Sequence, residues 1–212
     1  MAKTTRRVTS AATLCVALAF SACSSGPADP NADYAAKLQA ERAAKDTAFR
    51  RQIDQPIPAG RVSEFLPLKY FPADQSFVVP ASFAPAASRT PLQIPTSTGQ
   101  LRAMELVGTL EFTLKGQALS LGALVEAGTP PDQLFVPFTD LTSGTESYAA
   151  GRYLEIRRTV TGIYTIDFNR AFQPYCSYNN SYDCPYPPPS NRLPVPVRAG
   201  ERLSQPTLPA GR

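Results

Sequence analysis

The chain has 212 residues, a formal net charge of +4 and no histidine. The missing histidine excludes mechanisms and metal sites that need an imidazole, such as the Ser-His-Asp triad and the zincin motif. The positive charge is no sign of a nucleic-acid partner, because residues 1–22 carry three of the basic side chains and the remaining chain has a net charge of +1. We therefore expect no nucleic acid among the partners.

The first 22 residues have the pattern of a signal peptide. Basic residues precede the apolar run "AATLCVALAF", and the small pair Ser21-Ala22 leads to Cys23. This pattern resembles a bacterial lipoprotein signal, in which cleavage falls before the cysteine and its sulfur carries a diacylglycerol. An ordinary secretory signal, leaving Cys23 as a free thiol, is the alternative. We expect lipidation at Cys23, contact with the membrane through this lipid, and a location in the bacterial cell envelope.

Ser24 stands where retention at the inner membrane would show aspartate, so the resemblance indicates the outer membrane, with the protein facing the periplasm. Residues 23–32 are small, polar and rich in proline, as expected of a lipidated tether. Residues 33–56 predict an N-terminal helix in which Glu41 and Lys45 form an i,i+4 ion pair. The apolar stripe of this helix is thin, which predicts that it lies across the domain rather than inside it. The stripe consists of Tyr34, Leu38, Phe49 and Ile53.

Residues 57–212 are expected to form a single β-rich domain, because the hydrophobic period changes to two. The alternating pattern and the turn Lys115-Gly116-Gln117 predict a hairpin over residues 108–121, and residues 133–138 predict a further strand. Two segments bounded by proline indicate edge strands, and two glycine-led segments predict a second hairpin. The first two are residues 65–72 and 76–83, and the last two are residues 151–158 and 162–169.

The segment from Pro174 to the end is too rich in proline for a helix or a central strand. Its tyrosine, leucine and valine content favours an extended chain that wraps the domain. The predicted fold is mainly β: an antiparallel sandwich or a partly closed barrel with one N-terminal helix and a Pro-rich extended C-terminal wrap.

Cys15 falls within the predicted signal and Cys23 would be acylated, so Cys176 and Cys184 remain as a pair in an oxidising compartment. We predict a disulfide between Cys176 and Cys184. The alternatives are a zinc site, which would need two carboxylates as ligands in the absence of histidine, and a redox pair, which usually has the spacing Cys-x-x-Cys. No metal or cofactor is predicted.

Two blocks carry a resemblance to a known family. They are "FVPFTDLTSGTESYAAGRYLEI", residues 135–156, and "DFNRAFQPYCSYNNSYDCPYPPPSNRLPVPVRAGER", residues 167–202. They resemble the bacterial family catalogued as domain of unknown function 1684, and the resemblance covers most of residues 33–202. The family implies no activity, but it implies that the polar residues of the two blocks recur as a set.

These polar and aromatic residues are the candidates for ligand binding. In the register that places the apolar residues of the second hairpin on one face, Tyr153 pairs with Asp167 and Gly151 with Asn169. A phenol, a carboxylate and a carboxamide would then share a patch beside a position without a side chain. The candidates are Asp140, Ser143, Glu146, Tyr148, Arg152, Tyr153, Asp167, Asn169, Asn191 and Arg192.

Several tyrosines suit a pocket in which rings stack on sugars or anchor a partner, or they fill the contact between wrap and domain. They are Tyr148, Tyr153, Tyr175, Tyr178 and Tyr182. The sequence thus favours a lipid-anchored envelope protein that is a ligand-binding or structural module with a polar pocket. Its partner would be an unknown envelope ligand or protein.

The alternative function is a carboxylate-based hydrolase acting on an envelope component. It requires Glu146 and Asp167 to converge with Arg152 at one concave site. In the competing structural reading, the carboxylates of the motif blocks cap turns or pair with arginines, because "TDLTSGTE" is rich in turn-forming residues.

Overall fold

A computed structural model describes Met1 and residues 30–51 and 56–204, and every structural statement below concerns these residues. The predicted signal peptide, Cys23, most of the tether and Ile53 lie outside the described residues. Among the helices that are described, none is both long and apolar enough to cross a membrane.

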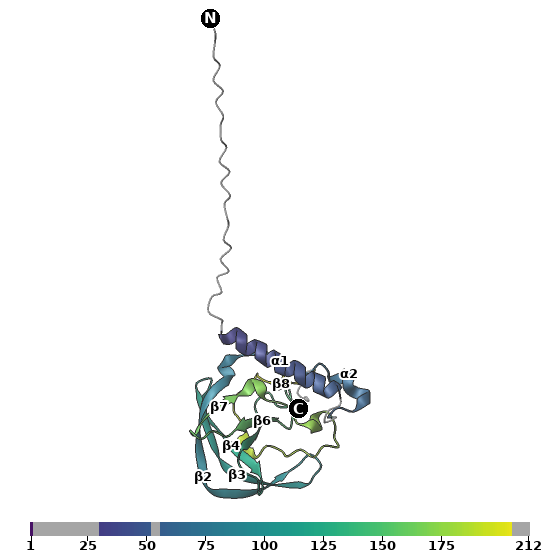
Figure 1. Ribbon diagram of the computed structural model, residues 1–212. Helices are drawn as coiled ribbons and strands as arrows, with labels where there is room; N and C mark the ends of the chain where they lie inside the picture. Colours follow the sequence, from purple (N-terminus) through teal and green to yellow (C-terminus); the bar gives the residue numbers. More distant parts are fainter. Residues whose placement is uncertain (2–29, 52–55, 205–212) are drawn as a thin grey trace.

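The six longer strands form one antiparallel sheet that curls into a nearly closed barrel (Figure 1). The strand order is β6-β5-β4-β3-β2-β7, and the terminal strands β6 and β7 approach each other across the opening. The prediction of a mainly β fold is confirmed, in its barrel form. The strands are β2 (Val78–Pro95), β3 (Leu101–Leu114), β4 (Gln117–Glu126), β5 (Gln133–Phe138), β6 (Arg152–Arg157) and β7 (Ile163–Asp167).

The predicted hairpin over residues 108–121 is confirmed as the β3–β4 pair. Lys115 and Gly116 form its two-residue turn with φ values of 51° and 80°. Positive φ at both central positions is the geometry of a type I′ turn, which matches the twist of the paired strands. From Gly108 onward every second residue of β3 is buried, and Leu110, Phe112 and Leu114 among them belong to the barrel core.

Strand β2 differs from the predicted edge strand, because it is longer and lies between β3 and β7. Its two partners overlap only at Ala81 and Ser82. Each proline of β2 therefore has a strand neighbour on one side only. Its missing N–H can fall on the side that has no neighbouring strand. The other predicted edge segment contains β1 (Lys69–Tyr70), which pairs with β8 (Glu201–Arg202) in a separate two-stranded sheet.

The second predicted hairpin is wrong, although both of its strands exist. β6 pairs with β5 and β7 pairs with β2, so the two strands are at opposite ends of the sheet order. Leu154, Ile156, Tyr164 and Ile166 all face the same barrel core. The alternation of apolar residues predicted the strands and their inner faces, but closure of the barrel determines which strands pair.

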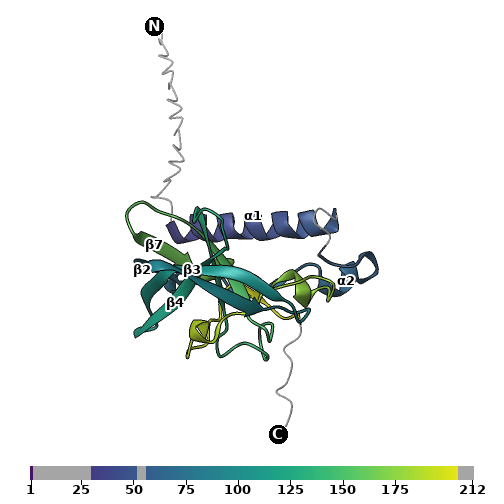
Figure 2. The same ribbon diagram turned by 90° about the horizontal axis from the view of Figure 1, so that it is seen from below.

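Helix α1 (Pro30–Arg50) lies across the barrel, as predicted, and buries Leu38 and Phe49 (Figure 2). It begins three residues before the predicted start. Glu41 and Lys45 do not pair with each other, because Glu41 binds Arg170 and Lys45 binds Glu201 of the barrel domain. A second helix, α2 (Val62–Phe65), has four residues.

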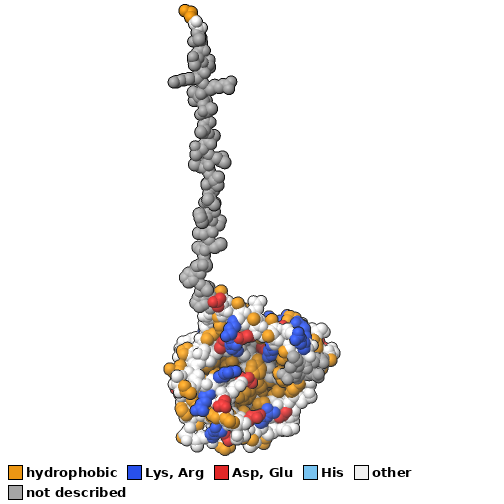
Figure 3. All heavy atoms as spheres, in the orientation of Figure 1, with side chains coloured by type: hydrophobic (Ala, Val, Ile, Leu, Met, Phe, Trp, Pro, Cys, Tyr) orange, Lys and Arg blue, Asp and Glu red, His pale blue; other side chains and the backbone are white. Residues whose placement is uncertain are grey.

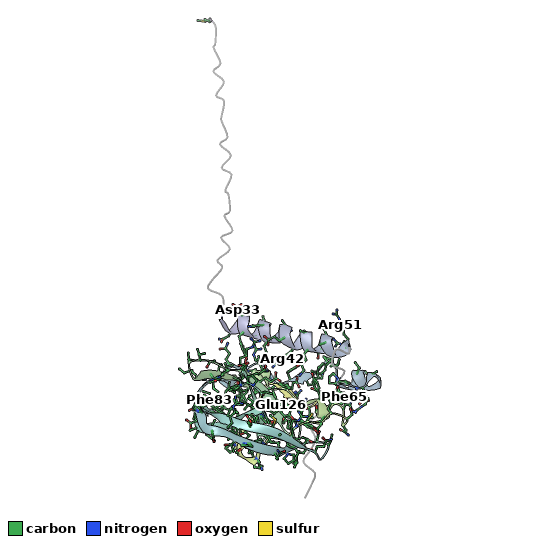
Figure 4. All side chains as sticks on the ribbon, turned by 60° about the horizontal axis from the view of Figure 1, so that its bottom comes forward. Asp33, Arg42, Arg51, Phe65, Phe83 and Glu126 are labelled. Carbon is green, nitrogen blue, oxygen red and sulfur yellow. The ribbon has the colours of Figure 1, made fainter. Side chains whose placement is uncertain are left out.

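Arg42 adds a further contact between α1 and the domain. Its guanidinium donates to the carbonyl oxygens of Phe71 and Asn169, both at 3.3 Å, and stands 4.3 Å from the ring centre of Tyr70. Figure 4 shows Arg42 between the helix and the strands. Burial lowers the pKa of Arg42.

The C-terminal segment wraps the barrel in extended form and short 3-10 turns, as predicted. Leu193, Val195, Val197 and Ala199 fill the barrel core, while Pro194 and Pro196 between them are exposed. The prolines thus stand where no buried N–H would need a partner.

Candidate functional site

A fully buried ion pair between Asp140 and Arg152 joins the barrel to the wrap. Arg152 donates from Nη2 to Asp140 Oδ2 at 2.8 Å and to the carbonyl oxygen of Val197 at 2.7 Å. Its Nη1 donates to the carbonyl oxygens of Ala199 and Glu201. Asp140 Oδ1 accepts from the backbone N–H groups of Thr142 and Val197. Both side chains are therefore committed to holding residues 197–201 against β6.

Asn169 and Asn191 each form hydrogen bonds with both backbone groups of one residue elsewhere in the chain. The Asn191 carboxamide accepts from the Gly122 N–H at 2.7 Å and donates to the carbonyl oxygens of Gly122 and Pro137 at 2.9 and 2.8 Å. Asn169 pairs in the same manner with both backbone groups of Asp74. A carboxamide carries the donor and the acceptor that a peptide group would offer, so both residues complete the backbone hydrogen bonding of the domain.

Glu201 is a buried carboxylate that the candidate residues did not include, although it lies in the second motif block. It accepts from Lys45 Nζ at 2.5 Å, from the backbone N–H of Gln173 at 2.8 Å and from the Tyr178 hydroxyl at 3.0 Å. Burial, followed by the charge of Glu201, raises the pKa of Tyr178. We call Asp140, Arg152, Asn191 and Glu201 the fastening residues, because their side chains tie the wrap to α1 and the barrel.

The two carboxylates of the hydrolase alternative belong to separate networks. Glu146 pairs with Arg198 Nε at 3.0 Å on the surface. Asp167 accepts from the Tyr34 hydroxyl and from Arg170 Nε, each at 2.9 Å. Arg152 contacts neither of them among its side-chain hydrogen bonds in the described residues. The two carboxylates therefore have different partners, and these contacts give the hydrolase arrangement no support.

The patch predicted from the second hairpin is also absent, since its strands do not pair. Gly151 is buried, and a Cβ there would stand 2.4 Å from the carbonyl oxygen of Phe138. The φ of +94° and the close contact with the backbone both favour glycine at this position. The same close packing leaves no open space for a ligand. Of the remaining candidates, Ser143 accepts from the Asp140 N–H, and Arg192 is exposed.

Cys176 and Cys184 are buried free thiols in contact with each other. The Cys176 N–H donates to Cys184 Sγ at 3.2 Å, and the Tyr148 oxygen lies 3.8 Å from Cys176 Sγ. The hydrogen bond between the two thiols lowers the pKa of Cys176 to about 6, and the same bond raises that of Cys184. The disulfide stays a prediction, and the close approach of the two residues is compatible with it.

An open groove of about 910 Å³ lies on the outer face of β3 to β6. Gln133 and Phe135 of β5 and Tyr153 and Glu155 of β6 line it, while residues 182–185 and Lys45 of α1 form part of its walls. Figure 3 shows an apolar hollow in this face of the molecule with charged side chains around it. The aromatic lining residues are Phe135, Tyr153, Phe172, Tyr175 and Tyr182.

The groove aromatics pack edge to face. The ring centroids of Phe135 and Tyr153 are 4.7 Å apart, and those of Tyr175 and Tyr182 are 5.2 Å apart. Tyr153 is 7% exposed and donates to the carbonyl oxygen of Pro185, so it belongs to the floor, whereas the rings of Phe135, Phe172, Tyr175 and Tyr182 are partly exposed. Such rings offer flat apolar faces to a ligand.

Sequence reasoning found only part of this groove. Tyr153 was a candidate, and Tyr175 and Tyr182 were among the tyrosines expected to line a pocket. Phe135 was missed, although its place between the core residues Leu134 and Val136 already indicated a large apolar side chain on the outer face of a strand. Tyr148 and Tyr178 lie outside the groove lining.

Comparison with known proteins places the chain in a class without an assigned activity. Residues 63–202 match the family described as "Protein of unknown function (DUF1684)", and the chain belongs to this family. The solution NMR structure of an uncharacterized protein from Haloarcula marismortui is similar, with a TM-score of 0.65 and 37% sequence identity. The match covers 81% of this chain and 95% of that chain. No curated protein matches the chain.

Proposed function

We propose that this protein is a lipid-anchored module of the cell envelope that binds a ligand in the groove on the outer face of β3 to β6. The observation that carries the proposal is the contrast between the solvent-exposed rings of the groove and the paired side chains of the fastening residues. The groove presents aromatic rings to solvent, whereas the fastening residues have their charges and amides paired within the fold. A cleft of this size with aromatic walls and a few polar groups is typical of a ligand site.

A thermal-shift screen tests this function. The domain from residue 30 onward is combined with peptidoglycan fragments, glycans, peptides and acyl compounds, and a ligand raises the melting temperature by linkage. The F135L variant keeps apolar bulk in the groove but removes a ring, so the shift should fall. The control is I163A, which removes an exposed apolar side chain outside the groove. A screen without any shift, or an equal shift in F135L, would contradict the proposal.

The membrane anchor is proposed from the sequence alone, from the signal pattern that ends at Cys23. In a bacterial host the full-length protein should fractionate with the outer membrane and carry acyl mass at residue 23. The C23S variant should lose the acyl mass and leave the membrane fraction. Wild-type protein with a free, unmodified residue 23 would contradict the anchor and would leave the groove proposal untouched.

We do not propose the hydrolase. Its two carboxylates are held by different partners, Glu146 by Arg198 and Asp167 by Tyr34 and Arg170. The binding function needs neither carboxylate.

A further inference from the structure

The acidic side chains of the groove outnumber the basic ones. Lys45 and Arg102 are its cations, and its acids are Glu126, Asp132, Glu155 and Asp183. Both cations already have partners. Lys45 Nζ binds Glu201 at 2.5 Å, and Arg102 Nη2 binds Asp183 at 3.0 Å, with Glu126 a further 4.0 Å contact of Arg102.

Asp132 and Glu155 remain without a cation. In the described part of the chain, neither carboxylate lies within ion-pair distance of a lysine or arginine. Glu155 accepts one hydrogen bond, from Gln133 Nε2 at 2.6 Å. Both residues are exposed, so their carboxylates are available to a ligand in the groove.

The strand register places one of these carboxylates beside the aromatic floor. Phe135 and Glu155 are directly opposite in the β5–β6 ladder, and Tyr153 precedes Glu155 by two residues. Since side chains two apart in a strand and those directly opposite share a face, Phe135, Tyr153 and Glu155 form one surface. A ring with its negative π-face next to an unpaired carboxylate attracts a cation through both groups.

We propose that the ligand of the groove carries an ammonium group on a ring-shaped or apolar body, with the ammonium held by Glu155 against the aromatic floor and Asp132 as a second unpaired carboxylate of the same groove. This inference rests on the proposed binding function. An anionic ligand would meet unpaired carboxylates of its own sign, and a neutral one would gain nothing from them. The ammonium chemistry occurs in amino sugars and in lysine-type side chains of peptides.

Matched ligands test the charge. Binding of the glucosamine tetrasaccharide is compared with that of the N-acetylglucosamine tetrasaccharide, and a lysine-containing tetrapeptide with its Nε-acetyl form, by calorimetry at low salt. We expect the ammonium form of at least one pair to bind about fivefold to thirtyfold more tightly, as one exposed ion pair and one cation–π contact allow. The pair that shows the preference identifies the source of the ammonium.

Matched variants test the residues. The double variant D132N/E155Q keeps the side-chain shapes and the acceptor for Gln133, and it should abolish the preference. E111Q on the exposed face of β3, outside the groove, also removes a carboxylate charge and should preserve the preference. Equal affinity for charged and acetylated ligands in the wild type, or an undiminished preference in the double variant, would overturn the inference while leaving the binding function in place. Absence of binding by all four ligands, together with a thermal-shift screen without hits, would instead remove the binding function itself.

Discussion

The fastening residues and the groove treat charge in opposite ways. Asp140, Arg152 and Glu201 are buried, and each forms several hydrogen bonds or ion pairs. These contacts hold the wrap, α1 and the barrel together. In the groove, Asp132 and Glu155 are exposed and lack a cation among the described residues. The most recognisable polar residues of this sequence therefore stabilise the fold. The groove is lined largely by residues that are less prominent in the sequence.

The largest expected effect is that of breaking the buried ion pair. The D140N variant leaves the Arg152 charge buried without its counter-charge, and losses of this kind cost about 3–5 kcal/mol of unfolding free energy. Urea denaturation measures the loss. The control is E146Q at the exposed Glu146–Arg198 pair, where we expect a change below about 1 kcal/mol. Similar losses in the two variants would erase the distinction between buried and surface pairs.

The second-largest expected effect on stability comes from the cysteine pair. A disulfide between Cys176 and Cys184 should stabilise the oxidised protein by about 2–3 kcal/mol relative to the reduced protein in the chain-entropy model. Intact mass spectrometry of protein from an oxidising compartment should find it two hydrogens lighter than after reduction. If the mass does not change on reduction, the two residues are free thiols and the prediction is wrong. The C176S/C184S variant is the control, since reductant should leave its stability unchanged.

Removal of the Asn191 carboxamide tests a fastening residue without a charge. In N191A the buried carbonyl of Pro137 loses its donor, which costs about 1–3 kcal/mol. Substitution of the exposed neighbour, R192Q, should stay within about 0.5 kcal/mol of wild type. Equal stability of N191A and wild type would show that Asn191 does not fasten the wrap.

Alkaline pH gives a smaller effect on the same network. Burial, then the charge of Glu201, raises the pKa of Tyr70 above its ordinary value of 10.0. A raised pKa means that the stability from neutral Tyr70 is complete below pH 10 and is lost as the pH rises from there towards the folded-state pKa. The Y70F variant should therefore show a slope of unfolding free energy against pH that is shallower by about 1.4 kcal/mol per pH unit above pH 10. Identical slopes would contradict the assignment.

Local patterns predicted the strands and the wrap, because the alternation of residues such as Leu154 and Ile156 follows directly from burial of one face. The pairing of β6 and β7 could not be predicted in this way, since barrel closure joins strands far apart in sequence. The groove was found only through its tyrosines for the same reason. Arg102, Phe135 and Phe172 come together from β3, β5 and the segment after β7, and no local spacing links them.

The most direct test of the central claim is amide chemical-shift mapping of the domain during separate titrations with the glucosamine tetrasaccharide and the lysine-containing tetrapeptide. We predict that the largest changes cluster around Phe135, Glu155 and Cys184, which line the groove. Changes centred on Glu146 and Asp167 would contradict the account of the groove as the ligand site, and no change with either ligand would contradict its preference for an ammonium ligand.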